Sequence, residues 1–477
     1  MKSDRKSSAG IWSRLITCAV LAGTSGFVAA EPSTTNDAAV AKVFAAFAQP
    51  GQPGCSVGAR RGSVLVHASA HGLADIAAGR KLNEQSVFNI ASISKQFTAF
   101  SILLLDERKA LSIDDPLTKY VPELAESARG VTLRHLLHHV GGLRDYEGLL
   151  MLRGRRLVDG ATQAETIRTL GRQRAANFPA GTKYVYSNSG YVLLATVVER
   201  VSGQSMKQFT AQNIFTPLAM AHTSIVDRYP ADIGALARGY TPAKEGFDID
   251  ESAWEQVGDG QVHTTVGDLL LWTDNFRSGR VGGAALVKRM TEVGVLESGE
   301  RLDYAAGLVL GEYNGLRMVG HSGGWAGYNS SLLMFPEQQF AVTVLCNRND
   351  QNPGKFARAV AEIFLADEMR RTGKRTPDDE ESADDKPPKA RWKPKNLAAY
   401  EGVYISDEAE ARCVLVQRGG VLVLEGCAPG AKLQPSERGE FYAPDLHVRL
   451  RFGEPTGTPA GFTLHTFGLD GLAFTKQ

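Results

Sequence analysis

Ser92 and Lys95 stand three residues apart, just before a strongly apolar run, and this spacing can activate a nucleophile. Positions i and i+3 of a helix lie on one face, so the Lys95 amine would lie over the Ser92 hydroxyl. A serine hydroxyl is a weak nucleophile until a neighbouring base takes its proton. Ser94 has no lysine three residues after it and does not fit the pattern. Because such pairs also arise by chance, other segments must supply a proton relay, an oxyanion hole and a pocket.

The segment that follows the pair predicts a buried helix that would hold it rigidly. A helix that is apolar nearly all round belongs in a core. The apolar residues are Phe97, Ala99, Phe100, Ile102, Leu103, Leu104 and Leu105.

Two later segments could complete a site. Tyr186 and Asn188 precede an apolar helix at residues 192–201, and from such a loop both side chains can point into one cavity. The alternative is simple helix capping by Ser187 or Asn188. The second segment, residues 318–328, is rich in glycine, which permits close backbone approach to a ligand.

A cluster of histidines invites a metal interpretation that the pattern does not support. His135, His138 and His139 have helical spacing, but no glutamate of the His-Glu-x-x-His type accompanies them. A metal hydrolase needs a fuller ligand set. The sequence therefore predicts no metal site.

Composition narrows the class of protein. The formal net charge of 477 residues is +1, so no overall field favours nucleic acid as a partner. A hydrophobic content of 43% can form a sizeable core, and the length fits two or three domains.

The first thirty residues predict a signal peptide. A basic start precedes an apolar segment that ends in Val28-Ala29-Ala30, a small-residue cleavage pattern. We expect export to the periplasm or medium, a mature chain from about Glu31 and no stable membrane span after processing. The alternative is an uncleaved anchor.

The chain then divides into three parts. Residues 37–47 predict a helix, residues 55–59 and 64–70 a hairpin, residues 330–335 and 340–346 two further strands, and residues 355–369 a closing helix. Residues 370–395 are charged, contain prolines and predict a linker. Residues 396–477 carry short, regularly spaced strands that predict a small antiparallel barrel or sandwich.

Three motifs stand in order along the chain, namely Ser92-x-x-Lys95, Tyr186-Ser187-Asn188 and His321-Ser322-Gly323. They resemble the serine beta-lactamase and penicillin-binding-protein family, in the branch of class C beta-lactamases, D-aminopeptidases and related serine esterases. Three further segments are similar to the same branch: Phe88-Asn89-Ile90-Ala91, Arg134-His135-Leu136-Leu137, and the Gly-Gly-Trp-Ala-Gly-Tyr run after Ser322. The resemblance covers residues 38–369, and the C-terminal strands more faintly resemble a lipocalin-like domain.

The resemblance implies an α+β fold in which an antiparallel sheet is flanked by helices, with a helical subdomain at about residues 112–276 and a separate all-β barrel. It implies that Ser92 is acylated, that Lys95 and Tyr186 share the general-base work, and that Asn188 binds Lys95 or a substrate amide. Backbone N–H groups of Ser92 and Gly324 would form the oxyanion hole. No deacylating glutamate of the class A kind can be placed, so Tyr186 would also serve deacylation. No cofactor is implied.

His321 departs from the family, whose third motif usually begins with lysine. Histidine is mostly neutral at pH 7, whereas lysine is a cation that can bind a substrate carboxylate. With Ser322, Gly323 and Gly324 it would line the substrate-binding strand.

The expected function is therefore an acyl-serine hydrolase acting on a small-molecule or peptide substrate: an ester, an amide or a D-amino-acid peptide. The alternatives are a weak beta-lactamase and a non-catalytic binding or regulatory module; the oligomeric state stays open. Loops at residues 146–159 and 240–255 are expected to shape the pocket.

Four cysteines follow the leader in a compartment that permits disulfides, although free buried thiols are an equal alternative. Cys413 and Cys427 flank a predicted hairpin and could face each other. In the family fold the first and last strands are antiparallel neighbours, which implies that Cys55 and Cys346 could also approach.

Overall fold

A six-stranded antiparallel sheet forms the centre of the structure, a computed structural model that describes residues 34–229, 233–370, 392, 394, 396–427, 430–453, 459–466 and 468–477. The strand order is β10-β11-β12-β13-β1-β2, so the N-terminal hairpin lies beside the last strands of the same domain. The bounds are β1 Cys55–Arg61, β2 Val64–His71, β10 Val309–Tyr313, β11 Leu316–Trp325, β12 Tyr328–Phe335 and β13 Phe340–Cys346. The predicted hairpin and the β12–β13 pair are confirmed, while β10 was not predicted.

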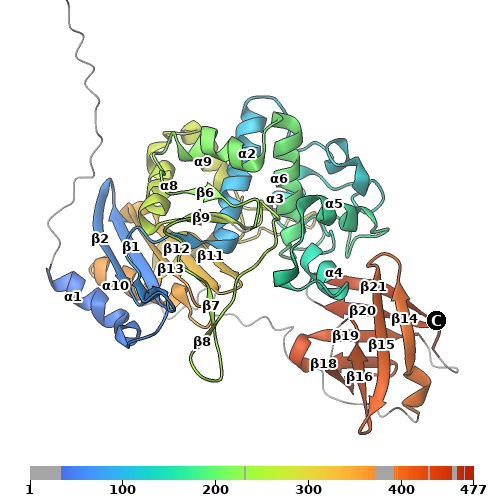
Figure 1. Ribbon diagram of the computed structural model, residues 1–477. Helices are drawn as coiled ribbons and strands as arrows, with labels where there is room; N and C mark the ends of the chain where they lie inside the picture. The colour runs from blue at the N-terminus through green and yellow to red at the C-terminus, as the bar shows by residue number, and fades with distance from the viewer. Residues whose placement is uncertain are drawn as a thin grey trace, which may run out of the picture.

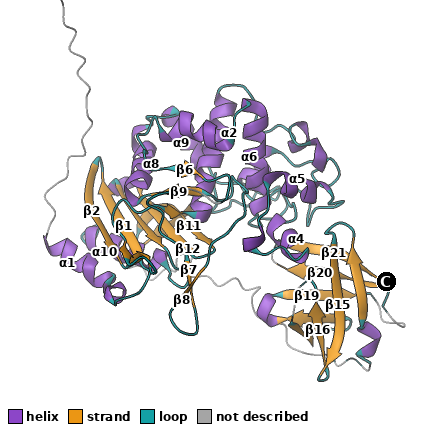
Figure 2. Cartoon of the chain, in the orientation of Figure 1, coloured by secondary structure: helices purple, strands orange, loops and turns teal. Residues whose placement is uncertain are grey.

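Helices cover both faces of this sheet (Figures 1 and 2). On one face α1 (Thr34–Val43) packs with α10 (Pro353–Phe364), and on the other α8 (Val266–Ser278) packs on β1 and β13. Burial on both sides explains why β1 and β13 are almost continuously buried instead of alternating with exposed residues. The α+β class predicted from the sequence is confirmed.

The β1–β13 pairing sets Cys55 opposite Cys346, and the structure joins the two as a disulfide. The bond lies in a fully buried cluster between the sheet and the α1–α10 layer. It links strands that are 291 residues apart in the sequence, and such a cross-link restricts the unfolded chain.

A largely helical region rises beyond the sheet around α2 (Lys95–Glu107) and α6 (Asn188–Ser202), which pack against each other (Figure 1). The remaining helices are α3 Leu133–Leu137, α4 Tyr146–Leu152, α5 Gln163–Gly171, α7 Met206–Thr210 and α9 Gly283–Met290. The helical subdomain was expected to extend through residue 276, and this boundary is wrong. Since α8 covers the sheet and the short strands β5 (Phe88–Asn89), β6 (Ser224–Ile225) and β9 (Val262–Thr264) form their own small sheet, the helical region ends earlier.

Eight C-terminal strands close into a barrel, which confirms the predicted all-β unit and adds strands that the pattern did not reveal. The bounds are β14 Gly402–Ser406, β15 Ala411–Arg418, β16 Val421–Glu425, β17 Ala431–Pro435, β18 Glu440–Ala443, β19 Val448–Phe452, β20 Gly461–Thr466 and β21 Leu469–Lys476. In the structure a disulfide joins Cys413 to Cys427 across the β15–β16 hairpin. The barrel lies beside α4 and β21 faces that helix (Figure 1).

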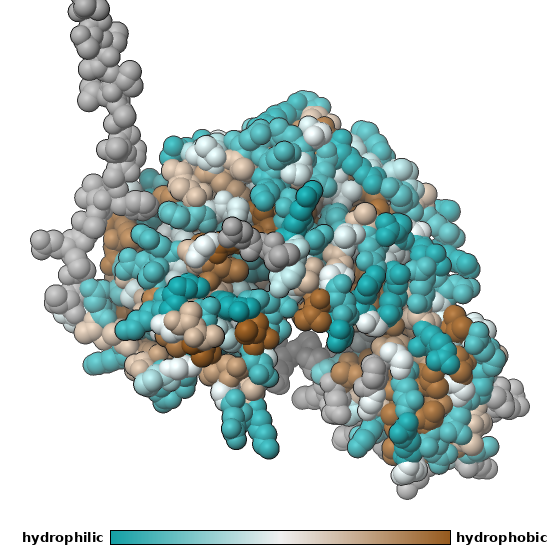
Figure 3. All heavy atoms as spheres, viewed as in Figure 1, coloured by the Kyte–Doolittle hydropathy of each residue, from teal (hydrophilic) through white to brown (hydrophobic). Residues whose placement is uncertain are grey.

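The surface seen in Figure 3 is mostly hydrophilic, with small separated hydrophobic patches. Across the described ranges, no helix combines the length and apolar character needed to cross a membrane. The predicted signal peptide, residues 1–30, lies outside the described residues, as does most of the predicted linker.

Candidate active site

Ser92 lies in a tight 3-10 turn, Ala91–Ser94, that leads directly into α2. Ala91 has φ of +47°, a left-handed conformation that costs energy for a residue with a side chain. The turn is held from both sides, because the Asn89 side chain accepts a bond from the Ala91 N–H (2.8 Å) and the Ser330 hydroxyl donates to the Ile90 carbonyl (2.9 Å). The surroundings therefore fix the backbone that carries Ser92.

Lys95 is completely buried, and its Nζ has three oxygen neighbours. It lies 3.0 Å from Ser92 Oγ, 2.8 Å from Asn188 Oδ1 and 2.9 Å from the Asp259 carbonyl oxygen. A neutral amine has two N–H bonds and one lone pair, so donation to Asn188 and Asp259 leaves the lone pair facing the Ser92 hydroxyl. Burial lowers the pKa of Lys95 to about 8, against the opposing effect of three nearby carboxylates. About a tenth of the Lys95 amines are therefore neutral at pH 7, far more than for an ordinary lysine.

The face of the Tyr186 ring lies against Lys95, with 4.9 Å between Lys95 Nζ and the ring centre. Its hydroxyl is buried and has no hydrogen-bond partner of ordinary geometry among the described residues. Burial raises the pKa of Tyr186 far above that of a free phenol, and the nearby Ser92 hydroxyl offsets this only in part. The phenol form is strongly favoured, so Tyr186 is suited to donate a proton rather than to act as a resident phenolate base.

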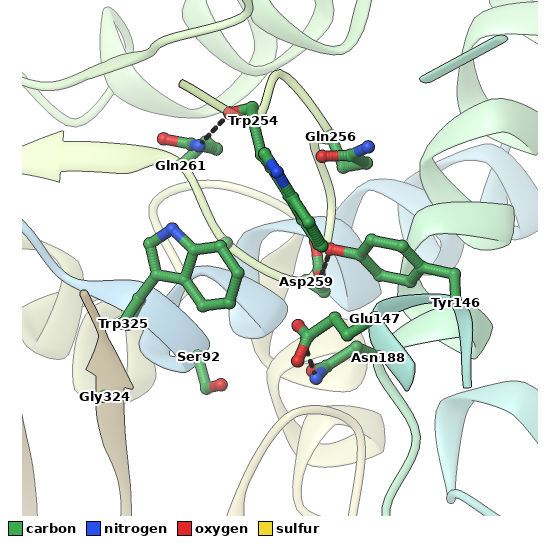
Figure 4. A pocket seen from close by; sticks show the side chains of 12 residues that line it. Ser92, Tyr146, Glu147, Asn188, Trp254, Gln256, Asp259, Gln261, Gly324 and Trp325 are labelled. Atoms are coloured by element: carbon green, nitrogen blue, oxygen red, sulfur yellow. Dashed lines mark hydrogen bonds between the residues drawn. The ribbon is translucent and has the colours of Figure 1, made fainter. Parts of the chain in front are cut away.

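Carboxyl groups also lie near Lys95, and two of them, those of Glu147 and Asp259, are seen beside Asn188 and Tyr146 in Figure 4. The Asn188 Nδ2 group donates to Glu147 Oε1 (2.8 Å), and the Tyr146 hydroxyl donates to Asp259 Oδ2 (2.9 Å). Burial and the neighbouring acids raise the pKa of Glu147 well above its usual range, and burial raises the pKa of Asp259 to about 6. These acids would gain from a positive charge placed beside them.

A pocket opens between Ser92 and these acids. Figure 4 shows Trp254 and Trp325 forming an aromatic wall, with ring centres 5.8 Å apart, opposite Glu147 and Asn188. The lining residues are Ala91, Ser92, Tyr146, Glu147, Asn188, Trp254, Gln256, Asp259, Gly260, Gln261, Gly324 and Trp325. The pocket thus has an apolar aromatic side and an acidic side that meet at the serine.

The third predicted motif lies on β11, next to the Ser92 turn. A side chain at position 323 would meet the Ile90 carbonyl at 2.3 Å, so glycine permits the close approach of strand and turn. Among the third-motif residues, Gly324 lines the pocket, whereas His321, Ser322 and Gly323 are outside its lining. The structure therefore brings Ser92, Lys95, Tyr186, Asn188 and Gly324 together.

His321 is buried, and both of its ring nitrogens are engaged. Nδ1 lies 2.5 Å from the Ser322 carbonyl oxygen and Nε2 lies 3.1 Å from the Tyr304 hydroxyl. A neutral ring satisfies both contacts, with one nitrogen donating and the other accepting. Burial lowers the pKa of His321 to about 4. It is therefore uncharged at neutral pH.

Sequence reasoning missed the acids Asp145, Glu147 and Asp259, and the aromatic neighbours His139 and Tyr304. The ring of His139 lies 4.2 Å from that of Tyr186, and Tyr304 lies 4.5 Å from His139. Two loops that were expected to shape the pocket contribute Tyr146, Glu147 and Trp254, although residues 146–152 form a helix. No sequence signal distinguished these acids from surface carboxylates.

The three clustered histidines contact separate partners. His135 accepts the Thr132 N–H, His138 lies between the carbonyls of Arg134 and Glu292, and His139 accepts the Ser187 N–H. Within the part of the chain that the structure describes, no three His, Cys, Asp or Glu residues are grouped to hold a metal ion.

Ser92 has a buried lysine beside it and lies next to a helix-covered antiparallel sheet. This arrangement is typical of one class of serine hydrolases. The Beta-lactamase family model matches residues 40–367, and the chain belongs to this family. It is a serine hydrolase of the beta-lactamase and penicillin-binding-protein type.

The similar proteins include a penicillin-binding protein and a D-aminopeptidase. The chain is 28% identical over 437 residues to Penicillin-binding protein 4* of Bacillus subtilis, covering 87% of this chain and 93% of that protein. It is 26% identical over 302 residues to a D-aminopeptidase of Brucella anthropi, covering 62% of this chain but only 56% of the relative. The octameric penicillin-binding protein homologue from Pyrococcus abyssi shares the fold, with a TM-score of 0.62, 22% identity, and coverage of 93% and 99% of the two chains.

Proposed function

We propose that this chain is an exported hydrolase that cleaves amides or short peptides of D-amino acids bearing a free amino group, through an acyl-Ser92 intermediate. The observation that carries the proposal is the partly buried carboxyl of Glu147, which lines the pocket beside Ser92. The similarity to a D-aminopeptidase supports the substrate class. The proposed division is a leader at residues 1–30, the hydrolase at 38–369, a linker at 370–395 and the barrel at 396–477.

Acylation begins when neutral Lys95 takes the Ser92 proton across 3.0 Å and Oγ attacks the substrate carbonyl carbon. The N–H groups of Ser92 and Gly324 stabilise the resulting oxyanion, at roughly 3 kcal/mol per donor. Tyr186, held as a phenol, donates its proton to the leaving nitrogen and recovers one from the Lys95 ammonium. The carbon–nitrogen bond breaks, and the free amine departs.

Deacylation reverses the proton path. Lys95, neutral again, accepts a proton from an attacking water, directly or through Tyr186, and the Ser92–acyl bond breaks as Oγ is reprotonated. The high pKa of Tyr186 favours Lys95 as the base in this half reaction too. The products are the amino acid and the regenerated serine.

The substrate ammonium would bind on the acidic side of the pocket. Glu147 is held there by Asn188 and is poorly ionised on its own because of burial and two neighbouring acids. A bound ammonium supplies the opposite charge that favours the carboxylate, and charge-assisted hydrogen bonds are among the stronger ones. Trp254 and Trp325 would contact an apolar side chain of the acyl residue.

A beta-lactam substrate fits the site less well. In the third motif a lysine would provide a cation for the beta-lactam carboxylate, whereas His321 is neutral and bonded through both nitrogens. Weak beta-lactam hydrolysis, or binding without turnover, is the second candidate, supported by the similarity to Penicillin-binding protein 4*.

The test is a substrate panel on the purified mature protein. We expect turnover of D-amino-acid amides, loss of that turnover on N-acetylation, slower turnover of the L-amides, and weak or no hydrolysis of nitrocefin. A fluorophosphonate probe should label the wild type and fail to label Ser92→Ala. Absence of labelling by any acyl probe would favour a non-catalytic binder, and equal turnover of free and N-acetylated amides would exclude the ammonium site.

A further inference from the structure

The C-terminal barrel contacts the hydrolase at the segment that leads into the acidic side of the pocket. The guanidinium of Arg144 is almost fully buried there and donates to Glu408 Oε2 (2.5 Å), in the turn between β14 and β15, and to Gln173 Oε1 (2.9 Å). The Gln173 side chain also donates to the Glu408 carbonyl oxygen (2.8 Å). A buried, charge-assisted set of bonds of this kind, which joins one guanidinium to both parts, holds them in one register better than exposed pairs do.

A second contact comes from the turn between β20 and β21. The Gly468 carbonyl oxygen accepts two bonds from the hydrolase, one from the Asp145 N–H (2.8 Å) and one from the Asn177 side chain (2.9 Å). Asn177 in turn accepts the Asp470 N–H (2.8 Å). The barrel thus binds the backbone of Asp145 directly.

Asp145 extends this contact into the active site. Its buried carboxylate accepts the N–H groups of Glu147 (3.1 Å) and Asn188 (2.7 Å), so it fixes the first turns of both α4 and α6. Asn188 then bonds Glu147 and Lys95 through its side chain. A continuous series of bonds therefore runs from the barrel turn to the amine beside Ser92.

The approach at this turn is very close. Gly468 has φ of +67°, and a Cβ built on it would lie 2.4 Å from the Asp145 Cβ. Any side chain at position 468 must displace Asp145 or the turn.

We propose that the barrel is a positioning part of the active site, and that the Gly468 turn and Glu408 hold the Arg144–Asp145 segment so that Glu147 and Asn188 meet Lys95 and the substrate. The labelling measurement rests on the proposed function, because it requires Ser92 to be the nucleophile. The hydrogen-exchange measurement does not. Gly468 and Glu408 touch no reacting atom and act through Asp145 and Arg144.

The experiment compares Gly468→Ala with Gly419→Ala in the full chain. Gly419 is a matched control, because it has a similar φ of +58° in a barrel turn but nothing within 4 Å of an added Cβ. Hydrogen exchange by mass spectrometry follows residues 145–148 and 186–190, and fluorophosphonate labelling of Ser92 is measured from pH 6 to 10.

We expect Gly468→Ala to speed exchange in both segments and to slow labelling at pH 7.5 by about ten- to a hundredfold, in line with the cost of small misplacements at a reacting centre. The labelling midpoint should move to higher pH, since water reaching Lys95 restores its ordinary basicity. Gly419→Ala should match the wild type. A variant that only lowered the folded fraction would leave the midpoint unchanged.

Equal exchange and labelling in the two glycine variants would overturn the proposal. If circular dichroism shows that Gly468→Ala does not fold, Glu408→Gln provides the test. We then expect faster exchange, slower labelling and a higher labelling midpoint, each by a smaller amount. An unchanged exchange rate and an unchanged midpoint in Glu408→Gln would contradict the proposal. If the wild type is not labelled at all, the proposed function fails, while the exchange comparison still tests the positioning role.

Discussion

The two sides of the Ser92 site differ in charge. On one side three carboxyl groups lie around Lys95, those of Asp145 and Asp259 buried and that of Glu147 partly buried. On the other, His139, Tyr186, Tyr304 and His321 form an aromatic group in which His139 and His321 are neutral because burial lowers the pKa of each. A ligand cation is favoured on the first side, and the second offers no fixed charge to a ligand anion.

This difference in charge bears on the two candidate functions, hydrolysis of D-amino-acid amides and hydrolysis of beta-lactams. Recognition of a carboxylate, as in beta-lactams, would draw on a cation at the third motif, whereas recognition of an amino group would draw on the acids. In the proposed substrate an amino group on the acyl side of the scissile bond would lie near Glu147 and Asn188, which line the same pocket as Ser92.

The largest effect should come from Lys95→Ala. Removing the base leaves Ser92 protonated, and we expect kcat/KM to fall by about 10²–10⁴-fold for every substrate class. Steady-state kinetics on an amide and an aryl ester measure this, with thermal unfolding as the control for folding. Unchanged turnover in a stable variant would remove Lys95 from the mechanism.

Tyr186→Phe should separate amides from esters. A phenol that donates to the leaving nitrogen matters for an amine, which departs badly without a proton, and hardly matters for a nitrophenolate. We expect a loss of roughly 10²-fold on amides and a much smaller loss on p-nitrophenyl esters. Equal losses on both substrates would instead make Tyr186 a general base for the serine.

Glu147→Gln tests the acidic side alone. Glutamine keeps the size and can still pair with Asn188, but it cannot offer a carboxylate to an ammonium. We expect KM for D-amino-acid amides to rise by about ten- to a hundredfold, the worth of a charge-assisted bond, with kcat less affected. The matched control is the N-acetylated amide or a simple aryl ester, for which KM should stay the same; a parallel rise there would indicate general disruption of the pocket.

The pH profile tests the base through the free enzyme. Lys95 has a pKa lowered to about 8, so its reactive neutral form increases as the pH rises through that value. Labelling of Ser92 by an uncharged fluorophosphonate should therefore increase about tenfold per pH unit below 8 and level off above it. A profile that instead climbs until pH 10 would point to deprotonation of an ordinary lysine or of Tyr186.

The nucleophile side of the site was predictable because its signal is local. Ser92 and Lys95 are three residues apart, and the apolar run after them matches the buried helix α2. The residues of the acidic side are distributed over the chain, with Asp259 more than a hundred residues after Glu147. Their meeting depends on how α4 packs on α6 and on how the loop before β9 lies against α2, and no spacing rule encodes that.

Burial was harder to predict than position. The family resemblance implies that Tyr186 lies near Lys95 and raises the question of a phenolate. Only the structure shows that its hydroxyl is buried and that its ring packs against His139 and Tyr304. The helical boundary at residue 276 failed for a related reason. The amphipathic pattern of α8 is the same whether its apolar face covers a helix or, as observed, the sheet at β1 and β13.

The smallest expected effect tests the neutral side. His321→Lys would introduce a cation where His321 is uncharged, because an extended lysine side chain carries its ammonium past the position that His321 Nε2 now occupies. We expect affinity for carboxylate-bearing beta-lactams to increase several-fold, about 1 kcal/mol for a partly desolvated pair, while D-amino-acid amides keep their KM. Competition of a penicillin with fluorophosphonate labelling measures the change. His321→Gln, which stays neutral, is the control, and equal penicillin affinity in both variants would mean that charge at position 321 does not decide which acyl donors Ser92 receives.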